Sequence, residues 1–195
     1  MKKYLELFAN GFDATIAEKT KVENWPYVGY DPMQDSVRYT EIQKPMIGPA
    51  DNEIWYTSTD GNTVTPYKTS TSVFGANIVS NTYENGKGVI KFDNSVTSIE
   101  YSAFRVCSTL TSIIIPNSVT TIGEQAFYYC TSITSITIPN SVTTIKSWAL
   151  EGCYFTLTSI IFEGTMEEWN AIDKGENWNY GISIYVQCTD GQVAI

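Results

Sequence analysis

The hydrophobic and polar positions of the chain follow a pattern that repeats every 23 residues. Residues 103–122 form the first full unit and residues 126–145 the second, and twelve or more positions agree between them. A third unit begins at Ala149 and continues to Phe162 with one inserted residue, and a partial unit precedes them at 90–99. Repeats of this length are supersecondary units that bury their apolar side only by stacking on neighbours. The pattern therefore predicts a β-rich (α+β) solenoid.

Within each unit, one stretch alternates between apolar and polar residues. The sequence Leu-x-x-Ile-x-Ile predicts a short strand with Ile113 and Ile115 pointing inward, stacked on the equivalent residues of the next unit. Pro116 and Pro139 should end the strands, because proline has no N–H for a ladder. The Ala-Phe-x-x-Cys stretch predicts a helical or 3₁₀ turn on the opposite side.

The pattern I-x-I-P-N-S-V-T-x-I-x-x-x-A-F-x-x-C closely resembles the BspA-type leucine-rich repeat of bacterial and protozoan surface proteins. The resemblance covers about residues 90–191, including a closing segment with Trp169 and Trp178. It implies a curved, right-handed solenoid with roles in adhesion or host-protein binding, and it brings no catalytic residues. Leu150 replaces the usual Phe, and the insertion near Tyr154 breaks the period, which indicates a third unit adapted to the cap.

The flanking sequences predict five parts. Residues 1–43 form a small N-terminal module for attachment or oligomerisation, and residues 44–51 are a Pro/Gly linker. Residues 52–89 form a β-hairpin N-terminal cap, residues 90–162 the repeats, and residues 163–195 a short-helix C-terminal cap.

Turn and capping signals define the two caps. Asn85-Gly86 should join two strands, and Asp60-Gly61 should join strands at 54–58 and 62–67. Thr165 and Glu168 form a capping box that opens a helix to about Ile172. Trp169 and Trp178 should cover the last repeat.

Charge and composition exclude several function classes. The chain has 195 residues, no histidine and a net charge of −9, so it carries no histidine-based triad and no basic footprint for nucleic acid. No stretch approaches the ~20 apolar residues of a membrane span. The first residues lack the apolar run of a signal peptide, so no leader is expected in this chain.

The cysteines Cys107, Cys130 and Cys153 recur at intervals of 23 residues. Equivalent positions point the same way, which disfavours disulfides, and no Cys-x-x-Cys pair supports a metal site. We expect buried free thiols, with Cys188 buried in the cap.

Other chemistry-bearing residues have structural explanations. Glu167-Glu168 point apart on a helix, and the Asp-Gly pairs at 60–61 and 190–191 lack the further ligands of a calcium loop. No cofactor and no metal are expected. Trp25, Trp55 and Tyr56 are candidates for exposed aromatic contacts, although packing is the favoured interpretation of each.

The strand parity defines a candidate binding face. If Ile113 and Ile115 point inward, the alternate residues point outward on the concave face. The predicted ligand-binding residues are Val89, Lys91, Ser112, Ile114, Ser135, Thr137, Ser159 and Ile161.

The sequence therefore predicts a noncatalytic module that binds a protein ligand, at the cell surface or in the extracellular space. The alternative is a structural phage or virion fibre or decoration protein that displays the repeats from an N-terminal anchor. We expect no binding to nucleic acid and no insertion into a membrane. The N-terminal module is a candidate for homo-oligomerisation.

Overall fold

The computed structural model describes residues 48–195, which form one compact unit. The predicted features of residues 1–47 lie outside the described part: the N-terminal module, most of the linker and Trp25. Within the described residues, no helix is long and apolar enough to cross a membrane.

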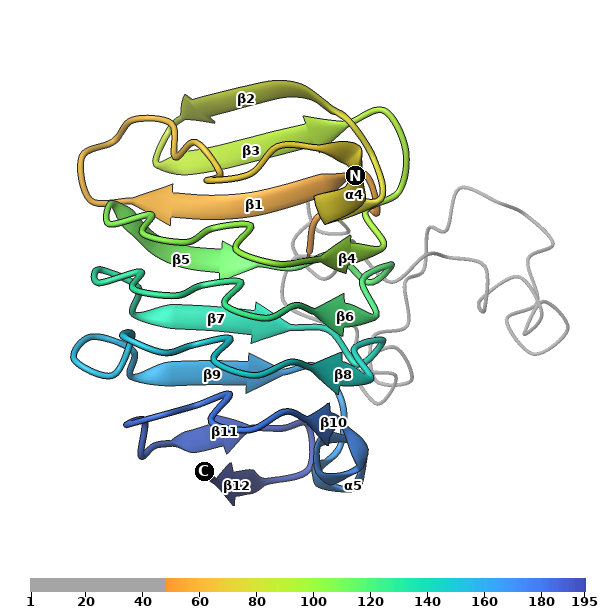
Figure 1. Ribbon diagram of the computed structural model, residues 1–195, viewed down its shortest axis with the longest axis vertical. Coiled ribbons are helices and arrows are strands. Elements are labelled where there is room, and N and C mark those ends of the chain that lie inside the picture. Colours follow the sequence, from red (N-terminus) through yellow and green to blue (C-terminus); the bar gives the residue numbers. More distant parts are fainter. Residues whose placement is uncertain (1–47) are drawn as a thin grey trace, which may run out of the picture. The chain divides into compact units, whose positions relative to one another are not determined.

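Two sheets run along a stack of four rungs (Figure 1). Each rung gives one strand to each sheet: β4 (Ser98–Ile99) and β5 (Leu110–Ile114), β6 (Thr121–Ile122) and β7 (Ser135–Ile138), β8 (Thr144–Ile145) and β9 (Ser159–Phe162), β10 (Asp173–Lys174) and β11 (Tyr185–Gln187). Neighbouring rungs pair in parallel, and Ile113 lies in register with Ile136, as the repeat predicts. The predicted solenoid is confirmed.

The larger sheet has eight strands because antiparallel strands extend both of its ends. Its order is β12-β11-β9-β7-β5-β1-β3-β2. The added strands are β1 (Glu53–Ser58), β2 (Ile78–Glu84), β3 (Lys87–Phe92) and β12 (Gln192–Ala194). The predicted hairpin at Asn85-Gly86 is present, with both residues at positive φ between β2 and β3.

The predicted Asp60-Gly61 hairpin is wrong. β1 pairs with β3 on one side and β5 on the other, and residues 62–67 form no strand. Two neighbouring strands already satisfy both edges of β1, so nothing remains for residues 62–67 to pair with. Asp60 Oδ1 instead accepts a hydrogen bond from Asn62 N, which makes a local turn.

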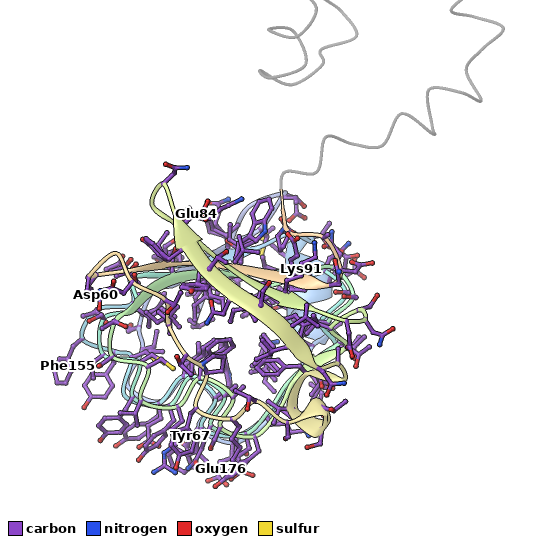
Figure 2. All side chains as sticks on the ribbon, turned by 90° about the horizontal axis from the view of Figure 1, so that it is seen from above. Asp60, Tyr67, Glu84, Lys91, Phe155 and Glu176 are labelled. Carbon is purple, nitrogen blue, oxygen red and sulfur yellow. The ribbon has the colours of Figure 1, made fainter. Side chains whose placement is uncertain are left out.

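The interior is a continuous column of apolar side chains from equivalent positions. Ile113, Ile115 and their counterparts are at most 1% exposed, and the rings of Phe104 and Phe127 stack with centroids 5.6 Å apart. Figure 2, which views the stack from above, shows side chains of the rungs pointing into the inside of the ring. Stacking of identical residues gives each rung a core that it lacks alone.

The Ala-Phe-x-x-Cys stretches form turns, and the predicted helical or 3₁₀ turn is wrong. Left-handed backbone interrupts each of them, at Ser102, Gln125 and Trp148 before the alanine. A second left-handed residue precedes each cysteine. Two left-handed positions in one turn are incompatible with a continuous helix. The turn N–H groups alternate: Phe104 N and Val106 N donate to the next rung, whereas Arg105 N and Cys107 N donate to the carbonyl three residues back.

Two short helices close the stack. α4 (Thr71–Phe74) covers the edge of β4, because Val73 and Phe74 accept hydrogen bonds from the backbone beside that strand. α5 (Met166–Ala171) begins at the predicted capping box, with Glu168 N donating to Thr165 Oγ1 at 3.2 Å. Trp169 is 1% exposed and packs edge-on against Phe162 and Trp178.

Candidate functional site

The outward-pointing side chains of the eight-stranded sheet form the candidate site, called the sheet face below. The strand parity is as predicted: all eight predicted residues are partly or fully exposed, and each is followed directly by a buried residue. They lie on β3 (Val89, Lys91), β5 (Ser112, Ile114), β7 (Ser135, Thr137) and β9 (Ser159, Ile161).

An apolar row crosses five neighbouring strands of the sheet face. Thr137 lies in register between Ile114 and Ile161, and Trp55 lies in register between Ile114 and Val89. The apolar row is therefore Val89, Trp55, Ile114, Thr137 and Ile161. At ~4.8 Å between strands, it spans about 19 Å.

β1 lies between β3 and β5 in the sheet, so Val89 and Lys91 are one strand removed from Ser112 and Ile114. This insertion brings Trp55 and Thr57 onto the face beside β5. Packing was the favoured interpretation of Trp55, but its side chain is partly exposed on this face. The available signal was the alternation of β1 itself: Ile54 and Tyr56 are buried, so Trp55 must point outward.

Neighbouring charges hold the Trp55 ring in place. Its Nε1 donates a hydrogen bond to Glu53 Oε2 at 2.9 Å, and Lys87 Nζ lies 3.8 Å from the ring centroid. Glu53 also pairs with Lys91 at 3.6 Å. A ring fixed from two sides loses little conformational freedom when a ligand covers it.

A hydroxyl row runs beside the apolar row, formed by Thr57, Ser112, Ser135 and Ser159. Thr57 Oγ1 lies 2.6 Å from both Ser112 Oγ and Thr111 Oγ1. Ser112, Ser135 and Ser159 are in register on consecutive strands. The sheet face thus combines an apolar stripe, a row of uncharged hydroxyl groups and the charged groups around Trp55, an arrangement that suits a protein surface.

Tyr56 contributes to the core beneath this face. It is 2% exposed, and its hydroxyl donates to Asn81 Oδ1 at 2.6 Å and accepts from Val64 N at 3.2 Å. Burial raises the pKa of Tyr56 above its usual value. The favoured interpretation of Tyr56 as a packing residue is confirmed.

All four cysteines are free and buried, as predicted. The Sγ atoms of Cys130 and Cys153 point at the carbonyls of Phe104 and Phe127, at 2.9 and 3.2 Å. Burial raises the pKa of Cys107 to about 11 and that of Cys153 to about 12. Thiols of this kind are poor nucleophiles and poor metal ligands at neutral pH.

In residues 48–195, no group of three or more Cys, Asp or Glu side chains converges to hold a metal ion. Asp190, one of the two Asp-Gly aspartates, accepts a hydrogen bond from Met166 N at the start of α5. This contact gives Asp190 a capping role.

Comparison with known proteins agrees with this architecture. The model of the BspA type leucine rich repeat region matches residues 76–172 in six copies. A leucine-rich cell surface protein of Faecalibacterium prausnitzii A2-165 is 37% identical over 43% of this chain and 22% of its own, with a TM-score of 0.41. A leucine-rich repeat protein of T. pallidum is 28% identical over 42% of each chain, with a TM-score of 0.33. No curated protein matches.

Proposed function

Because residues 76–172 belong to the BspA-type leucine-rich repeat family, we propose that this chain is a noncatalytic module that binds a protein ligand. The ligand contacts the sheet face, and the chain acts at the cell surface or in the extracellular space. Leucine-rich repeat domains are typically interaction modules that bind proteins, which supports this proposal.

The observation that carries the proposal is the apolar row, in which Trp55 lies between Val89 and Ile114. Ile161 is 40% exposed and Ile114 is partly exposed, whereas strands facing only water favour polar residues at such positions. A tryptophan within such a row is typical of the residues that dominate binding energy at interfaces. The alternative of a virion fibre depends on residues 1–43, and we do not propose it.

The test is the double variant Ile114→Glu with Ile161→Glu. Both carboxylates would be buried without a partner under a bound protein, so affinity should fall at least about 100-fold, from two penalties of ~1.4 kcal/mol or more each. Binding is measured by biolayer interferometry against a panel of purified extracellular-matrix proteins. Any partner found is then assayed with the variant.

The matched control is Val79→Glu, because Val79 is 59% exposed on β2 of the same sheet and lies outside the apolar row. It should bind like the parent chain. If the double variant keeps its melting temperature and still binds every partner with unchanged affinity, the sheet face is not the binding surface.

A further inference from the structure

A second surface lies where the turns of successive rungs leave the sheets. We name it the aromatic strip, defined by Tyr67, Tyr128, Tyr129, Tyr154 and Phe155 together with Arg105. Tyr67 is 59% exposed and Phe155 is 81% exposed, and Figure 2 shows both on the outside of the ring, on the side away from Lys91 of the sheet.

The rungs build the strip from equivalent positions. Arg105, Tyr128 and Glu151 occupy the same place after successive Ala-Phe or Ala-Leu pairs. Tyr129 packs over Gly152 of the next rung, where a Cβ would meet the ring at 2.6 Å. The missing side chain lets the ring lie against the backbone while 43% of Tyr129 stays exposed.

A depression of about 500 Å³ adjoins the strip at the Arg105 end. Tyr67 and Arg105 line it together with four hydroxyl side chains, those of Thr63, Thr65, Ser108 and Thr109. This lining provides hydrogen-bonding groups beside an aromatic ring, which is the combination that a sugar requires for its hydroxyls and its C–H faces.

Arg105 is the charged group of the depression. Its guanidinium lies 5.9 Å from the Tyr67 ring and 5.1 Å from the Tyr128 ring. The ion pairs of residues 48–195 are Lys91–Glu53 and Lys146–Glu100, so Arg105 has no carboxylate partner in that part of the chain. A guanidinium that lies beside two rings and pairs with no carboxylate of residues 48–195 is suited to bind a carboxylate through two parallel hydrogen bonds.

Backbone groups of the aromatic strip already make hydrogen bonds between successive rungs. Val106 N donates to Tyr128 O, and Tyr129 N donates to Glu151 O. A peptide ligand would need free backbone groups of this kind to form strand-like pairing. Side-chain hydroxyls, ring faces, one guanidinium and the exposed side chain of Val106 remain for a ligand. Hydroxyls beside ring faces favour a glycan over a peptide.

We propose that the depression and the aromatic strip bind a glycan that ends in a carboxylated sugar. The carboxylate pairs with Arg105, and the sugar hydroxyls meet the Thr and Ser side chains of the depression. The following neutral sugars extend along Tyr128 and Tyr129, where rungs repeat at ~4.8 Å. The Glu151 carboxylate beside Tyr128 accepts hydrogen bonds from their hydroxyls and repels a second acidic sugar. This site is independent of the sheet face.

The probe is sialyllactose, which carries one carboxylate on its terminal sugar followed by two neutral sugars, with lactose as the uncharged reference. Calorimetry with the full chain should show saturable binding of sialyllactose and binding of lactose at least about tenfold weaker, as expected for loss of a charge-assisted bidentate pair. Arg105→Gln should lose the same factor. Tyr128→Leu should also weaken binding, because the ring face is removed and apolar volume is kept.

Tyr185→Leu is the matched control, because Tyr185 is 63% exposed on β11 and lies outside the strip. It should bind like the parent chain. Circular dichroism and melting temperature confirm that each variant folds, and Arg105→Lys provides a second variant that keeps the charge without the bidentate fork. The proposal is overturned if sialyllactose does not bind, if Arg105→Gln binds unchanged, or if a polyproline peptide binds the strip and sialyllactose does not.

Discussion

At the scale of single residues, the period of two in each strand was enough to separate inward from outward side chains. Ile113 is 1% exposed and Ile114 is partly exposed, as the alternation predicts. The partners across the sheet could not be predicted in this way. Trp55 reaches the apolar row because β1 enters between β3 and β5, and that pairing depends on contacts far apart in the sequence.

The aromatic strip was also beyond the sequence pattern. Arg105 and Tyr128 occupy variable positions between Phe and Cys, which in a repeat indicate only exposure. Their meeting at 5.1 Å follows from the left-handed turns that bring successive rungs together. The repeat pattern therefore could not predict that these two side chains lie close together.

The buried thiols predict a dependence of stability on alkaline pH. Burial raises the pKa of Cys153 to about 12 from 9.0, so the folded state keeps a proton that the unfolded state loses. The contribution of the protonated Cys153 thiol to the free energy of unfolding is complete below pH 9. It is lost as pH rises toward 12, by about 1.4 kcal/mol for each pH unit. Urea unfolding at pH 8 and pH 10 should show a smaller loss of stability for Cys153→Ala than for the parent chain.

Ile160→Val is the control for the cavity that the cysteine variant creates. Ile160 is fully buried and has no titratable group, so its truncation should lower stability equally at both pH values. An equal pH dependence in Cys153→Ala and the parent chain would contradict the role of the thiol.

At the scale of elements, local signals were reliable where the partner was near in the sequence. Asn85-Gly86 and the capping box at Thr165 both have their predicted structures, since each depends on residues three or four positions apart. Asp60-Gly61 carries the same type of signal, but β1 is occupied by distant strands. A turn motif alone does not determine which strands it joins.

A prediction at this scale concerns the smaller sheet, where Glu100, Gly123 and Lys146 follow β4, β6 and β8. Lys146 Nζ reaches Glu100 Oε2 at 3.0 Å across the rung of Gly123. A Cβ at Gly123 would lie 2.6 Å from the backbone of Glu100. Gly123→Ala should therefore reduce the free energy of unfolding by about 1–3 kcal/mol through overpacking.

Urea denaturation measures this change. Gly48→Ala is the control, because a Cβ there meets nothing within 4 Å, and its stability should equal or slightly exceed that of the parent chain. A Gly123→Ala variant as stable as Gly48→Ala would show that the neighbouring backbone moves at no cost.

At the scale of the whole molecule, residues 48–195 have a core that runs from the β2–β3 hairpin to the tryptophans of the C-terminal cap. Each strand of the stack pairs only with strands of the adjacent rungs or caps, and the caps cover the two ends. The sequence predicted the repeat architecture and the antiparallel β2–β3 hairpin, whereas the antiparallel pairing of β1 with β5 came only from the structure.

We predict that residues 48–195 fold without residues 1–47. Val96 N and Ser118 Oγ donate to Asp51 O, which ties the start of this unit to the first rungs. The melting temperature of the fragment 48–195 should lie near that of the full chain. A fragment that begins at residue 59 lacks β1 and should lose cooperative unfolding, because β3 and β5 are then left with unpaired edges.

Differential scanning calorimetry of the three proteins tests this. A large loss of thermal stability in the fragment 48–195 would show that residues 1–47 belong to the N-terminal cap. A cooperative transition in the shorter fragment would show that β1 is dispensable.

The antiparallel strands near both ends of the larger sheet allow the number of rungs to change independently of the caps. β1 and β12 run opposite to the rungs that they cover, so another rung cannot be added beyond either one in the parallel register of the stack. Growth must occur in the interior, between β5 and β11, where every neighbour is parallel. Duplication of one 23-residue unit there would lengthen the sheet face by one strand while both ends stay unchanged. Duplication of a repeat in the gene can thus change the length of the sheet face while both caps keep their sequences.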